Sequence, residues 1–299
     1  MSSAHTAFIK LRQTLTYYLD NYGYGAKCPD TERVKTLLSE LSDGQRYELL
    51  SSTIDKYGDT VLRVAAYCKH TELCVILLSC LQPADRLKLI LLDERTALHW
   101  AAFIDDRKTA AGILNCLSAD QQLKLLCTQD SDGDTALSKA ALEDNADFEK
   151  VLLHKLTPDQ KSNLLIIQDN AGNTALHDAA HRGHMSTLKT LLDNLTPDQQ
   201  LQLLITQDRG GNTALHKAAL GNRTEIVKML MGNIIPEQQL QLLSVQNKKG
   251  KTASKIAVDY RERETAALLR KYESEAQLEV NCGKWWLLYK HAPVFKKIL

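Results

Sequence analysis

The chain has 299 residues, of which 44% are hydrophobic and 24% are charged, a balance typical of soluble globular proteins. The formal net charge of +1 gives no indication of a nucleic-acid partner, and no apolar run reaches the roughly 18 residues of a membrane span. The first residues lack the apolar core of a signal peptide. The seven cysteines are odd in number and contain no Cys-x-x-Cys pair, which favours free thiols in a reducing compartment. We therefore expect a cytoplasmic protein.

Residues 1–31 are predicted to form one helix followed by a turn rich in glycine and tyrosine. They do not share the pattern that fills most of the remaining chain. We expect this helix to cover the exposed first face of a stack of repeats, as terminal repeats must. A separate binding site is the alternative interpretation.

Residues 32–272 contain a repeating pattern. Its core, Gly-x-Thr-Ala-Leu-His-x-Ala-Ala, is clearest from Gly172, and the threonine recurs after one step of 36 residues and four steps of 39. The six threonines are Thr60, Thr96, Thr135, Thr174, Thr213 and Thr252. A threonine before a helix accepts hydrogen bonds from orphan amides, the paired alanines permit close packing, and a second amphipathic helix follows. Such a pair of helices is too small to bury its own apolar face, so neighbouring pairs must stack.

This pattern resembles the ankyrin repeat family. The resemblance rests on the Thr-Ala-Leu-His-x-Ala-Ala cores, best in the copies at Thr96, Thr174 and Thr213, and it covers most of the chain. It implies an all-α solenoid of about six repeats with helical caps. It also implies non-catalytic protein binding, as a scaffold, adaptor or inhibitor, without identifying the partner.

The repeats are longer than the 33 residues usual for ankyrin repeats. The additional length lies in a second recurring phrase, clearest as LTPDQQLQLLITQD from Leu195. Thr196 is placed to cap a helix, Pro197 to occupy its first position and Gln199 to complete a capping box. We therefore predict an additional short helix in each repeat, between the second helix and the turn. In the ankyrin family the turns before the first helices project as fingers. The turn before Thr96 is shorter than the others, which predicts a blunted finger there.

Three histidines, His177, His181 and His184, are spaced so that they could share one helical face, which raises the question of a zinc site. His99 and His216 occupy the place of His177 in other repeats, which indicates an architectural role. In the ankyrin family, histidines at such places hold the turn and the adjoining helix by hydrogen bonds. The sequence has no metal-binding, phosphate-binding or nucleophile motif. We expect no cofactor, no metal and no enzymatic activity, with a metal enzyme as the alternative.

The resemblance places partner contacts along a concave groove, at positions after the paired alanines and at the turns. Tyr67, Trp100 and Phe103 make the N-terminal part of this groove apolar, whereas later positions are more basic. We hypothesise a protein partner with an apolar anchor at one end and acidic residues towards the other. The alternative is that Trp100 and Phe103 fill space left by the short finger. The candidate partner-binding residues are Tyr67, Trp100, Phe103, Ile104, Lys139, Asp178, His181, Arg182, Arg209 and Lys217.

Residues 273–299 form an aromatic and basic tail that includes Trp285, Trp286, Lys296 and Lys297. We favour a helix that packs on the last repeat as a cap. The alternative is contact with a membrane surface or a partner, which would make the protein a peripheral membrane adaptor. A bacterial effector that acts on a host protein in the host cytosol is a further alternative. We expect a monomer divided into the cap, the repeat array and this tail, at 1–31, 32–272 and 273–299.

Overall fold

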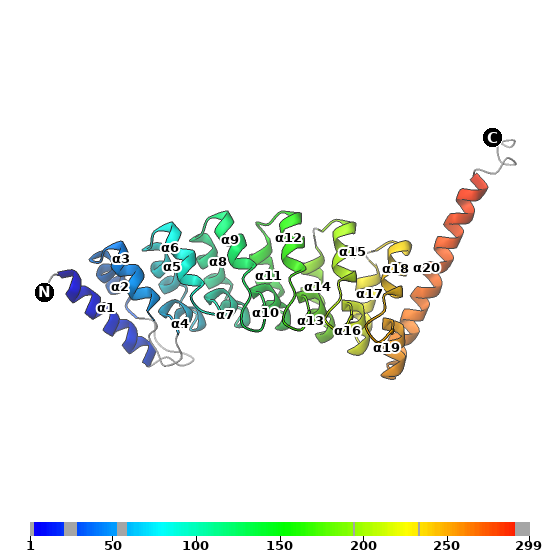
Figure 1. Ribbon diagram of the computed structural model, residues 1–299, viewed down its shortest axis with the longest axis horizontal. Coiled ribbons are helices and arrows are strands. Elements are labelled where there is room, and N and C mark those ends of the chain that lie inside the picture. Colours follow the sequence, from blue (N-terminus) through cyan, green and yellow to red (C-terminus); the bar gives the residue numbers. More distant parts are fainter. Residues whose placement is uncertain (1–2, 21–28, 53–58, 194, 233, 291–299) are drawn as a thin grey trace. The chain divides into compact units, whose positions relative to one another are not determined.

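The computed structural model describes residues 3–20, 29–52, 59–193, 195–232 and 234–290 (Figure 1). These residues form twenty α-helices and, within the same ranges, no β-strand, so the predicted all-α fold is confirmed. The chain divides into two compact units, residues 1–160 and 161–299, which are described separately below.

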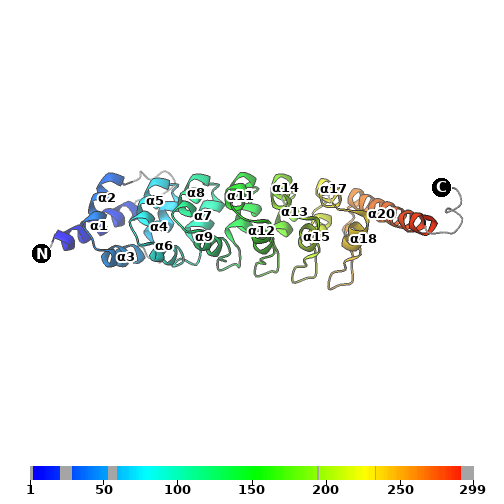
Figure 2. The same cartoon turned by 90° about the horizontal axis from the view of Figure 1, so that it is seen from above.

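Unit 1 repeats a set of three short helices. Helices α4, α7 and α10 form one row, α5, α8 and α11 a second, and α3, α6 and α9 a third (Figures 1 and 2). The helices of unit 1 are α1 (Ser3–Asp20), α2 (Thr31–Ser39), α3 (Asp43–Ser51), α4 (Val61–Tyr67), α5 (Thr71–Ser79), α6 (Pro83–Ile90), α7 (Ala97–Phe103), α8 (Arg107–Asn115), α9 (Ala119–Leu126), α10 (Ala136–Leu142) and α11 (Ala146–Leu153). Helix α12 (Pro158–Leu165) begins at the end of unit 1 and continues into unit 2.

Unit 2 continues the same three-helix pattern and ends in a long helix. Helix α13 packs on α16 and α16 on α19, while α20 packs on α17, α18 and α19. The helices of unit 2 are α13 (Ala175–Arg182), α14 (Met185–Leu192), α15 (Pro197–Ile205), α16 (Ala214–Leu220), α17 (Thr224–Gly232), α18 (Pro236–Ser244), α19 (Ala253–Asp259) and α20 (Arg263–Lys290). Helix α20 crosses the predicted boundary after residue 272, so the repeat array and the start of the tail share one helix. The division into cap, array and tail otherwise stays a prediction.

The first helix of each repeat is short, and its sequence favours a capped start and close packing. The threonine before it acts as the N-cap: Thr60 Oγ1 accepts from the amide of Arg63 at 3.3 Å, and Thr135 Oγ1 accepts from the amide of Ser138 at 3.1 Å. The paired alanines are fully buried, as at Ala101 and Ala102. Small side chains at these positions let the first helices of neighbouring repeats approach each other closely, which builds the core of the stack.

The predicted additional helix is present and has the predicted cap. Thr196 and Gln199 form the reciprocal capping box at the start of α15, with Pro197 in the first turn. The glutamine after Gln199, Gln200, joins α15 to the end of α14. Gln200 donates from Nε2 to the carbonyl oxygens of Leu192, at 3.1 Å, and Leu195, at 3.4 Å. The insertion is therefore held in place by hydrogen bonds to the C-terminal end of the second helix.

Candidate partner-binding surfaces

Buried histidines link neighbouring repeats within each unit. In unit 1, His99 lies 2.8 Å from Thr96 Oγ1 through Nδ1 and 2.9 Å from the carbonyl oxygen of Asp134 through Nε2. In unit 2, His177 makes the same pair of contacts to Thr174 and to the carbonyl oxygen of Asn212. Burial lowers the pKa of His99 and of His177 to about 4, so both rings are neutral at pH 7. The predicted architectural role of these histidines follows directly from the hydrogen bonds.

The three histidines that raised the question of a zinc site have different surroundings. Both ring nitrogens of His177 are hydrogen-bonded, whereas His181 is exposed at the end of α13. His184 is the N-cap residue of α14. Among the described residues, the groups close enough to share a metal ion contain carboxylates alone.

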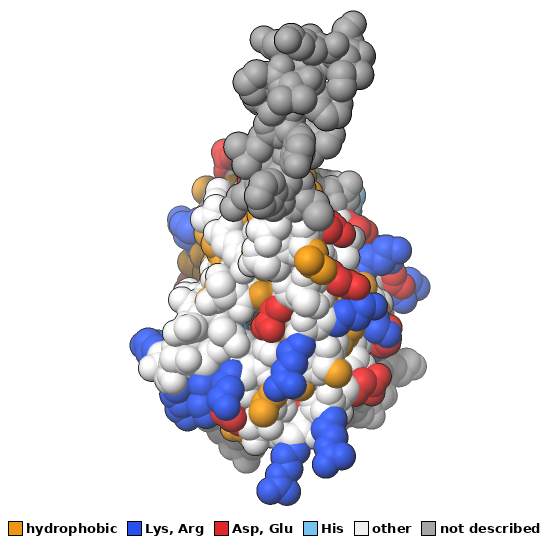
Figure 3. All heavy atoms as spheres, turned by 90° about the vertical axis from the view of Figure 1, so that its right-hand side faces the viewer, with side chains coloured by type: hydrophobic (Ala, Val, Ile, Leu, Met, Phe, Trp, Pro, Cys, Tyr) orange, Lys and Arg blue, Asp and Glu red, His pale blue; other side chains and the backbone are white. Residues whose placement is uncertain are grey.

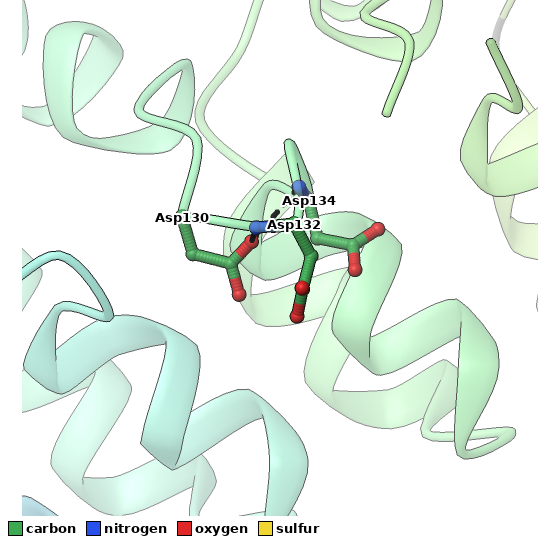
Figure 4. A group of neighbouring side chains, drawn as sticks. All are labelled: Asp130, Asp132 and Asp134. Carbon is green, nitrogen blue, oxygen red and sulfur yellow. Dashed lines mark hydrogen bonds between the residues drawn. The ribbon is translucent and has the colours of Figure 1, made fainter. Parts of the chain in front are cut away.

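Three such carboxylates meet in the finger before α10. Asp130, Asp132 and Asp134 lie close together, and the carboxylate of Asp130 accepts from the amides of the other two at 3.0 Å (Figure 4). Lys139 places its ammonium group among them, 3.2 Å from Asp130 and 3.4 Å from Asp132, and Arg95 pairs with the same two residues. Two cations of the chain itself therefore offset two of the three negative charges.

Two candidate partner-binding residues, Lys139 and Lys217, form ion pairs within the chain. The side chain of Lys139 is only 12% exposed, and its charge is directed into its own finger. Lys217 occupies the equivalent place in unit 2, 2.8 Å from Asp208. Both lysines hold the finger against the first helix of its repeat. Sequence reasoning missed this role, although the lysine follows the finger aspartate at the same spacing of nine residues in both repeats.

In unit 2 the fingers are joined to one another through their backbones. Arg209 donates its amide to the carbonyl oxygen of Ala171 at 3.1 Å, and Lys248 donates to that of Gly210 at 2.9 Å. Gln168 and Gln207 add side-chain bonds to the carbonyl oxygens of Gln207 and Gln246, at 2.8 and 2.9 Å. The tips are thus fixed relative to each other, which suits a rigid binding surface.

The exposed residues of the unit 2 fingers and first helices are largely basic. Arg209, Lys248 and Lys249 are exposed at the tips, and His181 and Arg182 are exposed at the end of α13. Figure 3 shows the end of unit 2, where Lys and Arg side chains project on the lower part of the face. Asp178, the remaining candidate on α13, is half-buried. This distribution provides several solvated cations within a single unit.

In unit 1 the candidate aromatic residues form one cluster. Tyr67, Trp100 and Phe103 meet edge to face, with ring centroids 5.0 Å apart for the first pair and 6.0 Å for the second. Phe103 is 47% exposed, whereas Tyr67, Trp100 and Ile104 are half-buried. We call Tyr67, Trp100 and Phe103 the aromatic cluster.

Two arginines and a small pocket complete the surroundings of Trp100. The guanidinium carbons of Arg63 and Arg95 each lie 5.5 Å from the centroid of the indole. A pocket of about 220 Å³ lies beside the indole and is lined by Asp59, Arg63, Val64, Tyr67 and Trp100. The buried indole Nε1 has no hydrogen-bond acceptor among the described residues. Because Arg95 belongs to the short finger, Trp100 packs against that finger while Phe103 projects into solvent.

The tail residues lie at the edge of what the structure describes. Trp285 and Trp286 are on α20, but their side chains lie outside the described residues. Lys296 and Lys297 also lie outside the described ranges. Their expected role in contact with a membrane or a partner stays a prediction. None of the described helices combines the length and the apolar character needed to cross a membrane.

Comparisons with known proteins identify ankyrin repeats in this chain. Residues 107–202 match a family model of three ankyrin repeats, and residues 176–231 match a second model of many copies of the ankyrin repeat. The crystal structure of EF0377, an ankyrin repeat protein, is similar over 71% of this chain and 96% of its own, with 24% sequence identity and a TM-score of 0.55. No curated protein matches the sequence.

The chain therefore contains ankyrin repeats, which confirms the resemblance inferred from the sequence. Ankyrin repeats are generally modules of protein–protein interaction and are typically non-catalytic. The similarity to the solved structure shows the fold alone, because fewer than a quarter of the aligned residues are identical.

Proposed function

We propose that this chain is a non-catalytic adaptor, scaffold or inhibitor that binds a protein partner through the aromatic cluster of unit 1. The observation that carries the proposal is the combination of an exposed phenyl ring at Phe103 with a half-buried Trp100 behind it. Aromatic side chains that are already packed lose little conformational freedom on binding, and they dominate the energetics of many interfaces.

The chemistry around the cluster indicates the kind of group it would hold. Phe103 offers apolar surface, and the pocket beside Trp100 is walled by Val64 and Tyr67. Arg63 and Arg95 pair with carboxylates of the chain, so their charges are partly satisfied. An apolar side chain of the partner would fit this environment better than a charged one, because no full charge would have to be desolvated.

Unit 2 supports binding of an acidic segment as a second part of the same proposal. Arg209, Lys248 and Lys249 are exposed on fingers that hydrogen bonds hold in place. Cations on a fixed surface attract acidic partners and accelerate association at low ionic strength. His181 and Arg182 add donors on the first helix of the same unit.

The proposal is tested by a charge at Phe103. We expect Phe103→Glu to reduce capture of the partner from lysate by at least tenfold in proximity crosslinking of the full chain, since interface hot spots contribute about 2 kcal/mol or more. Tyr260→Glu is the matched control, because Tyr260 is 61% exposed and directly follows the first helix α19, whereas Phe103 is the last residue of the first helix α7. Partner capture that survives Phe103→Glu but falls with Tyr260→Glu would contradict the proposal. Circular dichroism of both variants establishes that the helices are intact.

A further inference from the structure

The additional helix of each repeat creates a groove that sequence reasoning did not foresee. In unit 1, α8, α9 and α11 enclose an open groove of about 480 Å³, within the range of roughly 300–1,000 Å³ typical of ligand pockets. We call it the α8–α11 groove. Its floor includes Ala111 and Leu114 from α8, Leu126 from α9 and Val151 from α11. The groove lies on the second and third helices of the repeats, away from the aromatic cluster on α4 and α7.

One position distinguishes the lining of this groove from that of its equivalents. Position 111 is an alanine, whereas the residues 39, 78 and 117 positions later are all lysines: Lys150, Lys189 and Lys228. A lysine stem in place of Ala111 would cover the apolar floor. Gln122 lines the same groove, but its amide donates to the carbonyl oxygens of Leu114 and Leu117 at 2.7 and 3.2 Å. The floor therefore offers apolar surface with its neighbouring polar groups already satisfied.

The rim of the groove carries positive charge. Lys150 and Lys155 line it together with His154, and the lining contains no carboxylate. Lys155 donates to Asn115 Oδ1 at 3.2 Å, across the C-terminal ends of α8 and α11. Lys150 is 2.9 Å from Asp147, but both side chains are more than 60% exposed, so solvent screens this pair. Both ammonium groups are thus available to carboxylates of a bound segment.

The equivalent groove of unit 2 has a different character. It lies between α14, α15 and α17, where Lys189 takes the place of Ala111 and Asp193 that of Asn115. Glu225 and Lys228 also line it and pair at 2.6 Å. Its lining therefore carries both signs of charge. The same fold position thus gives an apolar, basic groove in unit 1 and a polar, mixed one in unit 2.

We propose that the α8–α11 groove binds an acidic amphipathic segment of a protein, with apolar side chains on its floor and carboxylates at Lys150 and Lys155. Charge argues against the chain's own tail as the occupant, because residues 284–299 carry four lysines and no acidic residue. The inference rests on the proposed function in one respect, namely that the ligand is a protein. It adds a second binding surface, which is specific for an acidic amphipathic segment.

The test uses a displayed library of random 14-residue peptides selected on the full chain. Selected peptides are synthesised, and their affinities are measured by fluorescence polarisation. We expect enrichment of leucine, isoleucine or phenylalanine at helical spacing together with aspartate or glutamate. Ala111→Lys should weaken binding at least tenfold, as should replacing the acidic residues of the peptide by glutamine. Lys189→Ala, the matched change in the unit 2 groove, should change the affinity less than twofold.

A second variant keeps the test valid if Ala111→Lys disturbs α8. Lys150 and Lys155 are exposed, so Lys150→Glu/Lys155→Glu leaves the packing unchanged and should also weaken binding at least tenfold. Peptides that bind both variants as well as the wild type, or that are enriched in basic residues, would overturn the proposal. If Ala111→Lys instead abolishes a dimer seen by sedimentation, the groove holds a second copy of this chain and the proposal is also wrong.

Phe103→Glu separates this inference from the proposed function. We expect this variant to bind the selected peptides with unchanged affinity. Selected peptides that no longer bind Phe103→Glu but still bind Ala111→Lys would be consistent with the proposed function and would overturn the groove proposal. A library that yields no peptide for the wild-type chain would overturn the groove proposal, while partner capture in the lysate experiment would still decide the proposed function.

Discussion

His99 Nε2 lies 2.9 Å from the carbonyl oxygen of Asp134, in the finger of the next repeat. A carbonyl oxygen can only accept a hydrogen bond, so Nε2 carries the proton and Nδ1 accepts from Thr96. The side chain of His99 is fully buried. One neutral tautomer therefore holds the hydroxyl of the N-cap residue of its own helix and joins it to the following repeat.

The first prediction concerns the strength of this link. His99→Gln should lower the free energy of unfolding by about 2 kcal/mol, because the buried carbonyl of Asp134 and hydroxyl of Thr96 lose well-placed partners. Urea unfolding followed by circular dichroism measures the change. His154→Gln serves as the control, since His154 is exposed and its one hydrogen bond within the described residues is to the carbonyl oxygen of Val151. Equal stabilities of the two variants would show that the link contributes nothing.

The second prediction is a pH dependence of stability. Burial lowers the pKa of His99 from an ordinary 6.5 to about 4, against the opposing effect of its hydrogen bond to Asp134. Between these two values the unfolded chain binds a proton that the folded chain does not. The stability that depends on neutral His99 is therefore complete above pH 6.5 and is lost as the pH falls towards 4.

The measurement is the difference between wild type and His99→Gln. The free energy of unfolding of the wild type should fall more steeply between pH 6.5 and pH 4, by about 1.4 kcal/mol per pH unit. The carboxylates titrate in both proteins, so their contribution cancels in the difference between the two free energies of unfolding. Parallel pH profiles for the two proteins would contradict the assignment of a neutral, buried ring.

Local signals in the sequence predicted most of the fold. The threonine caps, the alanine pairs and the capping box of Thr196 and Gln199 each depend on residues a few positions apart, so spacing alone indicates them. The repeat then places one helix set beside the next. The aromatic cluster was also named from sequence, because its members occupy the same part of neighbouring repeats.

Other features depend on packing that spacing does not encode. The contact of Arg95 with Trp100 exists because the short finger brings the arginine over the indole. Lys139 looked like an exposed groove cation, but its stem folds back over the finger to reach Asp130. The α8–α11 groove requires side chains from three helices in two repeats. The one signal for it in the sequence is the alanine at position 111, where later repeats have lysine.

The third prediction concerns the joined fingers of unit 2. Gly172 has φ of +82°, and a Cβ atom there would lie 2.5 Å from the backbone nitrogen of Arg209. Gly172→Ala should therefore break the bond from Arg209 to Ala171 and cost about 1–3 kcal/mol. Amide hydrogen exchange at Arg209 should become faster.

Gly232→Ala provides the control for this change. Gly232 ends α17, and a Cβ atom there would meet nothing within 4 Å. Alanine at that position should leave stability unchanged or raise it by up to about 1 kcal/mol, because it restricts the unfolded chain. Slow exchange at Arg209 in Gly172→Ala would show that the fingers tolerate a wider spacing than the structure indicates.

The fourth prediction concerns Lys139. Burial opposes its charged form, but the carboxylates of Asp134 and Asp130 outweigh this and raise its pKa above the ordinary value. Lys139→Met would leave Asp130, Asp132 and Asp134 facing Arg95 alone, at a cost of about 2 kcal/mol at pH 7. Lys124→Met, at an exposed lysine of α9, should have little effect.

Acid should remove most of the difference between Lys139→Met and the wild type. Burial alone would raise the pKa of Asp130, but the amide of Asp134 and the ammonium of Lys139 lower it below the ordinary 3.8. The stability that Asp130 derives from Lys139 is thus complete above that value and is lost as the pH falls through the lower pKa of the folded state. Urea unfolding at pH 7 and at a series of pH values below 3.8 follows this loss. A difference that stays undiminished down to the lowest pH of the series would mean that the lysine stem, and not its charge, stabilises the finger.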